Sequence, residues 1–234
     1  MVSLVQPLSE TVTPARETLG ERVTRELREL LISGRVGPGD KLSLRKVAEA
    51  LGVSMMPVRE AVSRLAADGA LEVLPGRAVH VPVLTLGQFR ELTRIRLVVE
   101  GFAAEEAARH ASAGDLATIG RFERDFRFAA AMDPNDPAGL VAINRELHFA
   151  LYRASGMVSL VEMIERLWLK AGPILNLDMR FEPARIKGGS AVQSHAGILA
   201  AMMARDAVAA RAALQADISA AARHIECTGK LRAD

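Results

Sequence analysis

The chain has 234 residues, of which 50% are hydrophobic and 4% aromatic, with one cysteine and a formal net charge of +2. This composition provides for one large or two smaller domains, favours helices over a β-sandwich or barrel, and excludes an internal disulfide framework. The apolar runs fall short of the roughly 20 residues of a membrane span, so we expect a cytoplasmic protein without a membrane partner.

The N-terminal part begins without a regular pattern and then becomes helical. Residues 1–16 show no periodicity and are expected to form a flexible arm. From about Glu17, apolar residues recur at helical spacing and predict a helix that ends at Gly34. The turn-forming sequence GRVGPGD follows this helix.

Two further helices and a hairpin complete the first domain. Ser43 is expected to cap a helix over residues 44–51, and Ser54 to cap a third helix, with Gly52 at the tight turn between them. The sequence LEVLPGRAVHVPV then alternates apolar run, turn and apolar run, which predicts a β-hairpin. Three helices and a hairpin are the element order of a winged helix-turn-helix domain, which we place at residues 17–83.

The rest of the chain, residues 84–230, is a series of helical patterns with short breaks. Helices this long and closely spaced predict an antiparallel bundle, so the fold class is mainly α. The expected helices are 86–112, 114–132, 136–155, 157–177, 182–203 and 205–226.

The second and third helices carry a family resemblance. From the residues alone the pair is either a DNA-reading helix-turn-helix or an ordinary helical hairpin. The run PVREAVSRLAADGALEVLPGR, together with the turn GVS, resembles the DNA-binding domain of GntR-family bacterial transcription regulators. The segment LHFALYRASG and its helical surroundings resemble the all-helical ligand-binding FCD domain of the FadR-type branch. The resemblance implies a homodimer that binds double-stranded operator DNA and dimerises through the bundle.

The resemblance also implies residues that contact DNA. Two arginines that contact bases or backbone correspond to Arg45 and Arg59, and a phosphate-binding hydroxyl corresponds to Ser54. The wing-tip glycine that enters the minor groove corresponds to Gly76, with Arg77 beside it. Simple chemistry agrees, because an arginine fork fits guanine O6 and N7, and a helix N-terminus suits phosphate.

Two methionines occupy the start of the expected recognition helix. Many relatives have a basic or polar residue at the position of Met55. We expect Met55 to face DNA through its thioether, against a thymine methyl or a sugar edge. Met56 is expected to pack inward or along the backbone.

The bundle carries polar residues on apolar helical stripes, namely Asn144, His148, His195 and Asp217. They are either satisfied core groups or a site, since buried polar groups need partners. Imidazole and oxygen ligands suit Zn²⁺, Ni²⁺ or Mn²⁺. Relatives bind a divalent metal through one Asp and three His, so the resemblance implies a metal at these four positions, with Asn replacing the Asp and Asp replacing the last His. His224 is a further candidate ligand.

An effector site is expected in the same interior. Arg96 matches a family arginine near the ligand cavity and would be the counter-ion of a small carboxylate, with Asn144, His148 and His195 beside it. The alternative for Arg96 is a surface ion pair with Glu100 at i+4. Trp168 and Phe149 are expected in the core.

The predicted function is a ligand-responsive, sequence-specific transcriptional regulator, and a repressor rather than an activator. One alternative is a metal-dependent enzyme that uses His148, His195 and Asp217. The other is a winged-helix module for protein contacts.

Overall fold

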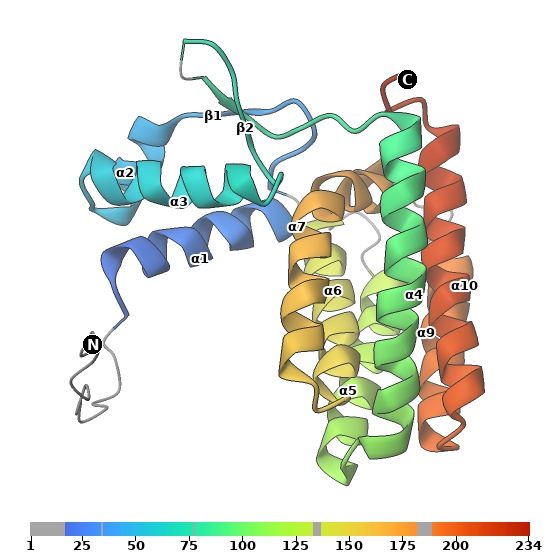
Figure 1. Ribbon diagram of the computed structural model, residues 1–234. Helices are drawn as coiled ribbons and strands as arrows, with labels where there is room; N and C mark the ends of the chain where they lie inside the picture. The colour runs from blue at the N-terminus through green and yellow to red at the C-terminus, as the bar shows by residue number, and fades with distance from the viewer. Residues whose placement is uncertain (1–16, 34, 77, 133–136, 182–188) are drawn as a thin grey trace, which may run out of the picture.

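The computed structural model describes residues 17–33, 35–76, 78–132, 137–181 and 189–234. The expected arm, residues 1–16, lies outside these ranges, as does Arg77. Figure 1 shows a small head, built from the first helices and a short sheet, beside a larger helical bundle. The mainly α fold with a winged head is therefore confirmed.

The head is a three-helix unit with one shared core. Its helices are α1 (Leu19–Ile32), α2 (Leu44–Leu51) and α3 (Met55–Ala67). The predicted bounds of α2 are confirmed, and Gly52 ends it with a φ of 63°, the left-handed conformation that glycine tolerates best. The α1 helix begins with a capping box between Thr18 and Glu21, a signal that the sequence reading missed.

The wing is a three-stranded antiparallel sheet with the order β1-β3-β2. The predicted hairpin is confirmed as β2 (Glu72–Val73) and β3 (Val79–His80). The third strand, β1 (Lys41–Leu42), pairs with β3 and was not predicted. A two-residue strand has no alternating pattern that would distinguish it from a turn.

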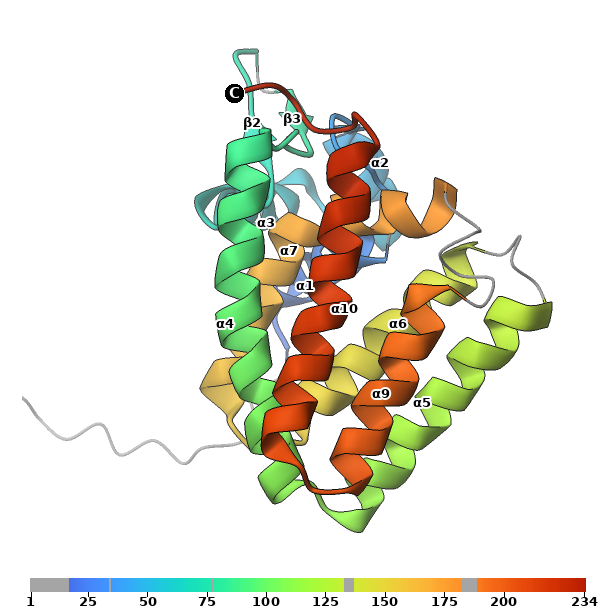
Figure 2. The same ribbon diagram turned by 90° about the vertical axis from the view of Figure 1, so that its right-hand side faces the viewer.

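The bundle helices lie side by side and alternate in direction in Figures 1 and 2. Small residues on α4 allow close approach to α10, because Ala103, Ala104, Ala107 and Ala108 are all fully buried. The expected helix 136–155 is shorter than predicted, and the expected start at residue 182 lies outside the described residues. The helices are α4 (Leu86–His110), α5 (Ala113–Met132), α6 (Pro137–Arg153), α7 (Val158–Phe181), α9 (Ser190–Met203) and α10 (Ala207–Cys227).

The chain end returns to the linker between head and bundle, beside the start of α4 (Figure 1). The Arg232 N–H donates to the Leu84 carbonyl, and the Leu86 N–H donates to the Arg232 carbonyl, both at 3.0 Å. Asp234 accepts from the Gly87 N–H at 2.9 Å. None of the described helices combines the length and the apolarity that crossing a membrane requires.

Candidate functional site

The α3 helix presents two opposite faces. Val58, Val62 and Leu65 are buried in the core of the head. Arg59 is exposed on the other face. The helix that the sequence predicted for recognition therefore has a solvent-facing side with a bidentate donor on it.

The two methionines differ in exposure, and the expected DNA contact of Met55 stays a prediction. Met55 is partly buried and packs against the head core, because it lies three residues before Val58 and seven before Val62 on the same stripe. Met56 is 66% exposed, so the prediction that it packs inward is wrong. Of the two thioethers, that of Met56 is the one presented on the outer face.

The other predicted DNA contacts lie on the same head. Arg45 is exposed on α2, and Ser54 is exposed at the start of α3. Ser54 holds the N-cap position, but its side chain makes no capping hydrogen bond, so that part of the prediction is wrong. Gly76 has a φ of 82° and lies exposed between β2 and β3, as a wing tip requires. The prediction for Arg77 falls outside the described residues.

A cluster of three donors lies inside the bundle. His148 on α6, His195 on α9 and Asp217 on α10 are 3%, 1% and 5% exposed. One ligand atom from each lies within 4.8 Å of the others. We call these three residues the donor cluster. Phe126 packs edge-on against the His195 ring, with 4.5 Å between ring centroids.

The donor cluster continues into a chain of buried polar groups. Arg96 donates to Glu100 through Nε at 2.6 Å and through Nη2 at 3.2 Å. The Tyr152 hydroxyl donates to Glu100 at 2.5 Å, and His148 Nδ1 lies 3.0 Å from the Tyr152 oxygen. His148 Nε2 lies 3.4 Å from Asp217 Oδ2.

These contacts assign the role of His148 Nδ1. The Tyr152 proton is used toward Glu100, so its oxygen accepts from Nδ1–H of His148. Nε2 of the same ring faces the Asp217 carboxylate. A ring nitrogen and a carboxylate oxygen at this distance can share one bound cation.

Burial and charge shift two pKa values in this chain. Burial acts to lower the pKa of the Arg96 guanidinium, but the charge and hydrogen bonds of Glu100 outweigh it and raise that pKa. Burial and the Glu100 charge raise the pKa of the Tyr152 hydroxyl well above its ordinary value. Arg96 is therefore a fixed cation and Tyr152 a neutral donor.

The ion pair between Arg96 and Glu100 matches one of the two expectations for Arg96, and its effector-binding role stays a prediction. The i+4 pair exists, but it is buried instead of lying on the surface. Glu100 and Tyr152 were missed as parts of the site, although each lies four residues from a predicted member on the same helix. Asn144 is partly buried one turn before His148, and its role stays a prediction.

The aromatic neighbours lie in the core, as expected. Trp168 and Phe149 are each 4% exposed. The Arg96 guanidinium carbon lies 5.3 Å from the centroid of the Trp168 ring. The indole Nε1 of Trp168 is buried and has no hydrogen-bond acceptor among the described residues.

Comparison with known families matches both parts of the chain. The model described as "Bacterial regulatory proteins, gntR family" matches residues 19–81, and the FCD domain matches residues 91–220. The chain belongs to the GntR family. Its members with this second domain pair a DNA-binding head with a small-molecule-binding bundle, so this GntR-family protein is a transcriptional regulator rather than an enzyme.

Individual relatives agree with this assignment. The HTH-type transcriptional regulator McbR of Escherichia coli is 34% identical over 79% of this chain and 82% of its own length. The gluconate operon transcriptional repressor of Bacillus licheniformis is 36% identical over 44% of this chain and 42% of its own.

Solved structures have the same fold. The structure of E. coli McbR/YncC has a TM-score of 0.82 at 31% identity and covers 90% of this chain and 98% of its own. A GntR regulator from Rhodococcus sp. RHA1 has a TM-score of 0.71 at 25% identity, over 89% of this chain and 98% of its own.

Proposed function

We propose that this regulator is a homodimeric, cytoplasmic repressor whose bundle binds a small carboxylate effector together with a divalent metal. The observation that carries the proposal is the donor cluster, in which three buried side chains from three helices converge. The alternative of a winged-helix module for protein contacts leaves the exposed Arg45 and Arg59 without a role.

The donor set fits a divalent metal. His148 Nε2 and Asp217 Oδ2 lie 3.4 Å apart, close enough for both atoms to coordinate one cation. Donor atoms within 4.8 Å of one another can share one ion with bonds of roughly 2.0–2.2 Å after small side-chain rotations. Imidazole and carboxylate suit Zn²⁺, Ni²⁺ or Mn²⁺, and Asn144 is the proposed further ligand. When bound, the metal would supply positive charge for an anionic effector.

The proposed carboxylate effector is supported by two donors beside the cluster. The Trp168 indole N–H lacks an acceptor among the described residues, and its ring lies 5.6 Å from that of His148. Arg96 places a fixed positive charge over the same indole, and Glu100 uses only two of its five N–H groups. An effector carboxylate could accept from both side chains.

The homodimer is supported by an apolar stripe on α4. Ile95, Val98 and Phe102 lie at helical spacing on one face and are 42%, 60% and 38% exposed. An exposed apolar stripe is typical of an interface, and a two-fold operator requires two heads.

The α6 helix is the proposed connection between effector site and head. It carries His148 and, three residues earlier, Arg145, which pairs with Glu29 of the head. An effector or metal that shifts α6 would therefore change how the head is held, and binding at the two sites would be coupled.

The proposal is tested by what the purified protein holds. Elemental analysis should find about one Zn, Ni or Mn per chain, and adding the metal to stripped protein should raise its melting temperature. Saturation at about 100 times the Kd should stabilise the fold by about 2.7 kcal/mol. The variant His148→Ala should show no such rise. If none of the three metals changes the melting temperature of stripped wild-type protein, the proposal of a metal site is contradicted.

A further inference from the structure

A cavity lies outside the bundle interior, where the head meets the bundle. It measures about 400 Å³ and is lined by residues of α1, α3, α6 and α7. Five arginines and three glutamates line it, and Ile32, Phe149 and Leu169 form its apolar part. We call it the joint cavity. Its excess of positive charge and its size suit a small anion.

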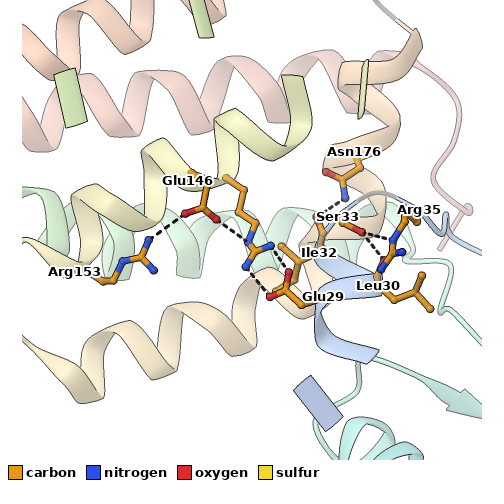
Figure 3. A network of polar contacts seen from close by, with 9 residues as sticks. Glu29, Leu30, Ile32, Ser33, Arg35, Glu146, Arg153 and Asn176 are labelled. Carbon is orange, nitrogen blue, oxygen red and sulfur yellow. Dashed lines mark hydrogen bonds and ion pairs between the residues drawn. The ribbon is translucent and has the colours of Figure 1, made fainter. Parts of the chain in front are cut away.

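One arginine of the joint cavity already holds a carboxylate. Arg145 donates to both oxygens of Glu29, from Nη1 at 2.5 Å and from Nη2 at 2.7 Å. Figure 3 shows Glu29 on the head and Glu146 with Arg153 on the bundle side of this network. This is the two-point geometry by which an arginine recognises any carboxylate.

The Glu29 carboxylate that the Arg145 guanidinium binds is replaceable. The Glu29 side chain is 40% exposed, so water competes for its pairing with Arg145. Arg145 itself is held independently of Glu29, since its guanidinium lies over the Phe149 ring at 6.0 Å. The fork would keep its place if another carboxylate displaced Glu29.

A second anchor is present in the same cavity. Arg28 faces Glu165 at 3.6 Å and Asp68 at 3.9 Å, both too far for hydrogen bonds. Its guanidinium thus has donors that neither carboxylate uses. In a ligand with two carboxylates, one carboxylate can bind the Arg145 guanidinium and the other can pair with Arg28.

We propose that the joint cavity is a second binding site, for a small dicarboxylate. One carboxylate takes the place of Glu29 in the fork of Arg145, and the other pairs with Arg28. Binding there breaks the ion pair between α1 and α6 and so loosens the head on the bundle. The effect on DNA binding rests on the proposed function, whereas the binding itself does not.

The test is calorimetric titration of the full chain with succinate at constant ionic strength. Glu29→Gln removes the competing carboxylate and should bind succinate about fivefold more tightly than wild type. Arg145→Gln should lose binding, and Arg145→Lys, which keeps the charge but not the fork, should weaken it. The control Glu226→Gln, in a surface pair on the bundle, should match wild type.

The outcomes separate this proposal from the bundle site. All titrations are repeated in the presence of the His148→Ala substitution, which breaks the donor cluster. The tighter succinate binding caused by Glu29→Gln should persist. Equal succinate affinity in wild type and Glu29→Gln would overturn the proposal, as would full affinity in folded Arg145→Lys. If Glu29→Gln still binds succinate more tightly but the protein binds no metal or no operator DNA, the result would count against the proposed function alone.

Discussion

At the scale of residues, the buried pair of Arg96 and Glu100 organises the bundle interior. Both side chains are almost fully buried, and their charges cancel inside a low-dielectric core. Glu100 also accepts a hydrogen bond from the Tyr152 hydroxyl, which orients the phenol and, through it, the imidazole of His148. The ion pair thus positions His148 of the donor cluster in addition to neutralising the two buried charges.

Breaking this pair should be costly. Glu100→Ala leaves the Arg96 charge buried without its partner, and we expect a loss of about 3–5 kcal/mol in the free energy of unfolding. The matched variant Glu226→Ala breaks the surface pair with Arg90 and should cost far less. Urea denaturation of both variants measures the difference. Similar losses in the free energy of unfolding of both variants would show that burial of the Arg96–Glu100 pair does not increase its contribution to stability.

DNA recognition should depend on the exposed face of α3. Arg59→Ala is expected to weaken binding to a preferred duplex by about 1–3 kcal/mol, because one bidentate donor is removed. Arg109→Ala, an exposed arginine at the end of α4, is the control and should bind as wild type. Fluorescence anisotropy at fixed salt provides the comparison. Unchanged affinity of Arg59→Ala would remove this residue from the interface.

The two methionines should separate stability from sequence preference. Met55→Ala removes packing from the head core and should lower the melting temperature. Met56→Ala should melt as wild type but change the bases selected from a random duplex library. The reverse pattern would contradict the placement of these side chains.

At the scale of elements, the sequence predicted what local signals encode. Helical periodicity and N-caps located α2 and α3 closely, and the turn around Gly76 located the hairpin. The sequence could not predict β1, because this strand exists only through its pairing with β3. The link from Tyr152 to Glu100 spans 52 positions, so only tertiary packing reveals it. The different exposure of Met55 and Met56 shows that neighbouring helix positions, turned by about 100° from each other, can differ in burial.

Contact between head and bundle depends on close backbone packing. A Cβ on Gly172 of α7 would lie 3.3 Å from Ile32 Cα and from the Leu31 carbonyl oxygen of α1. Gly172→Ala should therefore destabilise the protein and speed hydrogen exchange in α1. Gly197→Ala, in α9, meets nothing within 4 Å and should stabilise by roughly 0.5–1 kcal/mol. Equal stabilisation by both would contradict this packing.

At the scale of the whole molecule, two heads must be joined for a two-fold operator to be read. Val98→Glu places a charge in the proposed α4 interface and should give a folded monomer by analytical ultracentrifugation. Phe128→Glu alters a residue that is 66% exposed on α5 and should leave the dimer intact. A dimeric Val98→Glu protein at micromolar concentration would place the interface elsewhere.

Two bundle helices, α6 and α7, are bonded to the head. The α6 helix holds the donor cluster through His148 and the head through Arg145. The α7 helix holds the head too, since the Asn176 amide donates to the Ile32 carbonyl at 2.8 Å (Figure 3). A shift of either helix would therefore change how the head is held.

One affinity measurement tests whether the donor cluster controls the head. The dissociation constant for a duplex selected by the protein is measured with metal-stripped protein and again at saturating metal. We predict a change of at least about fivefold in wild type, within the usual range of coupling between sites, and none in His148→Ala. Equal affinities in wild-type protein with and without the bound metal would contradict the claim.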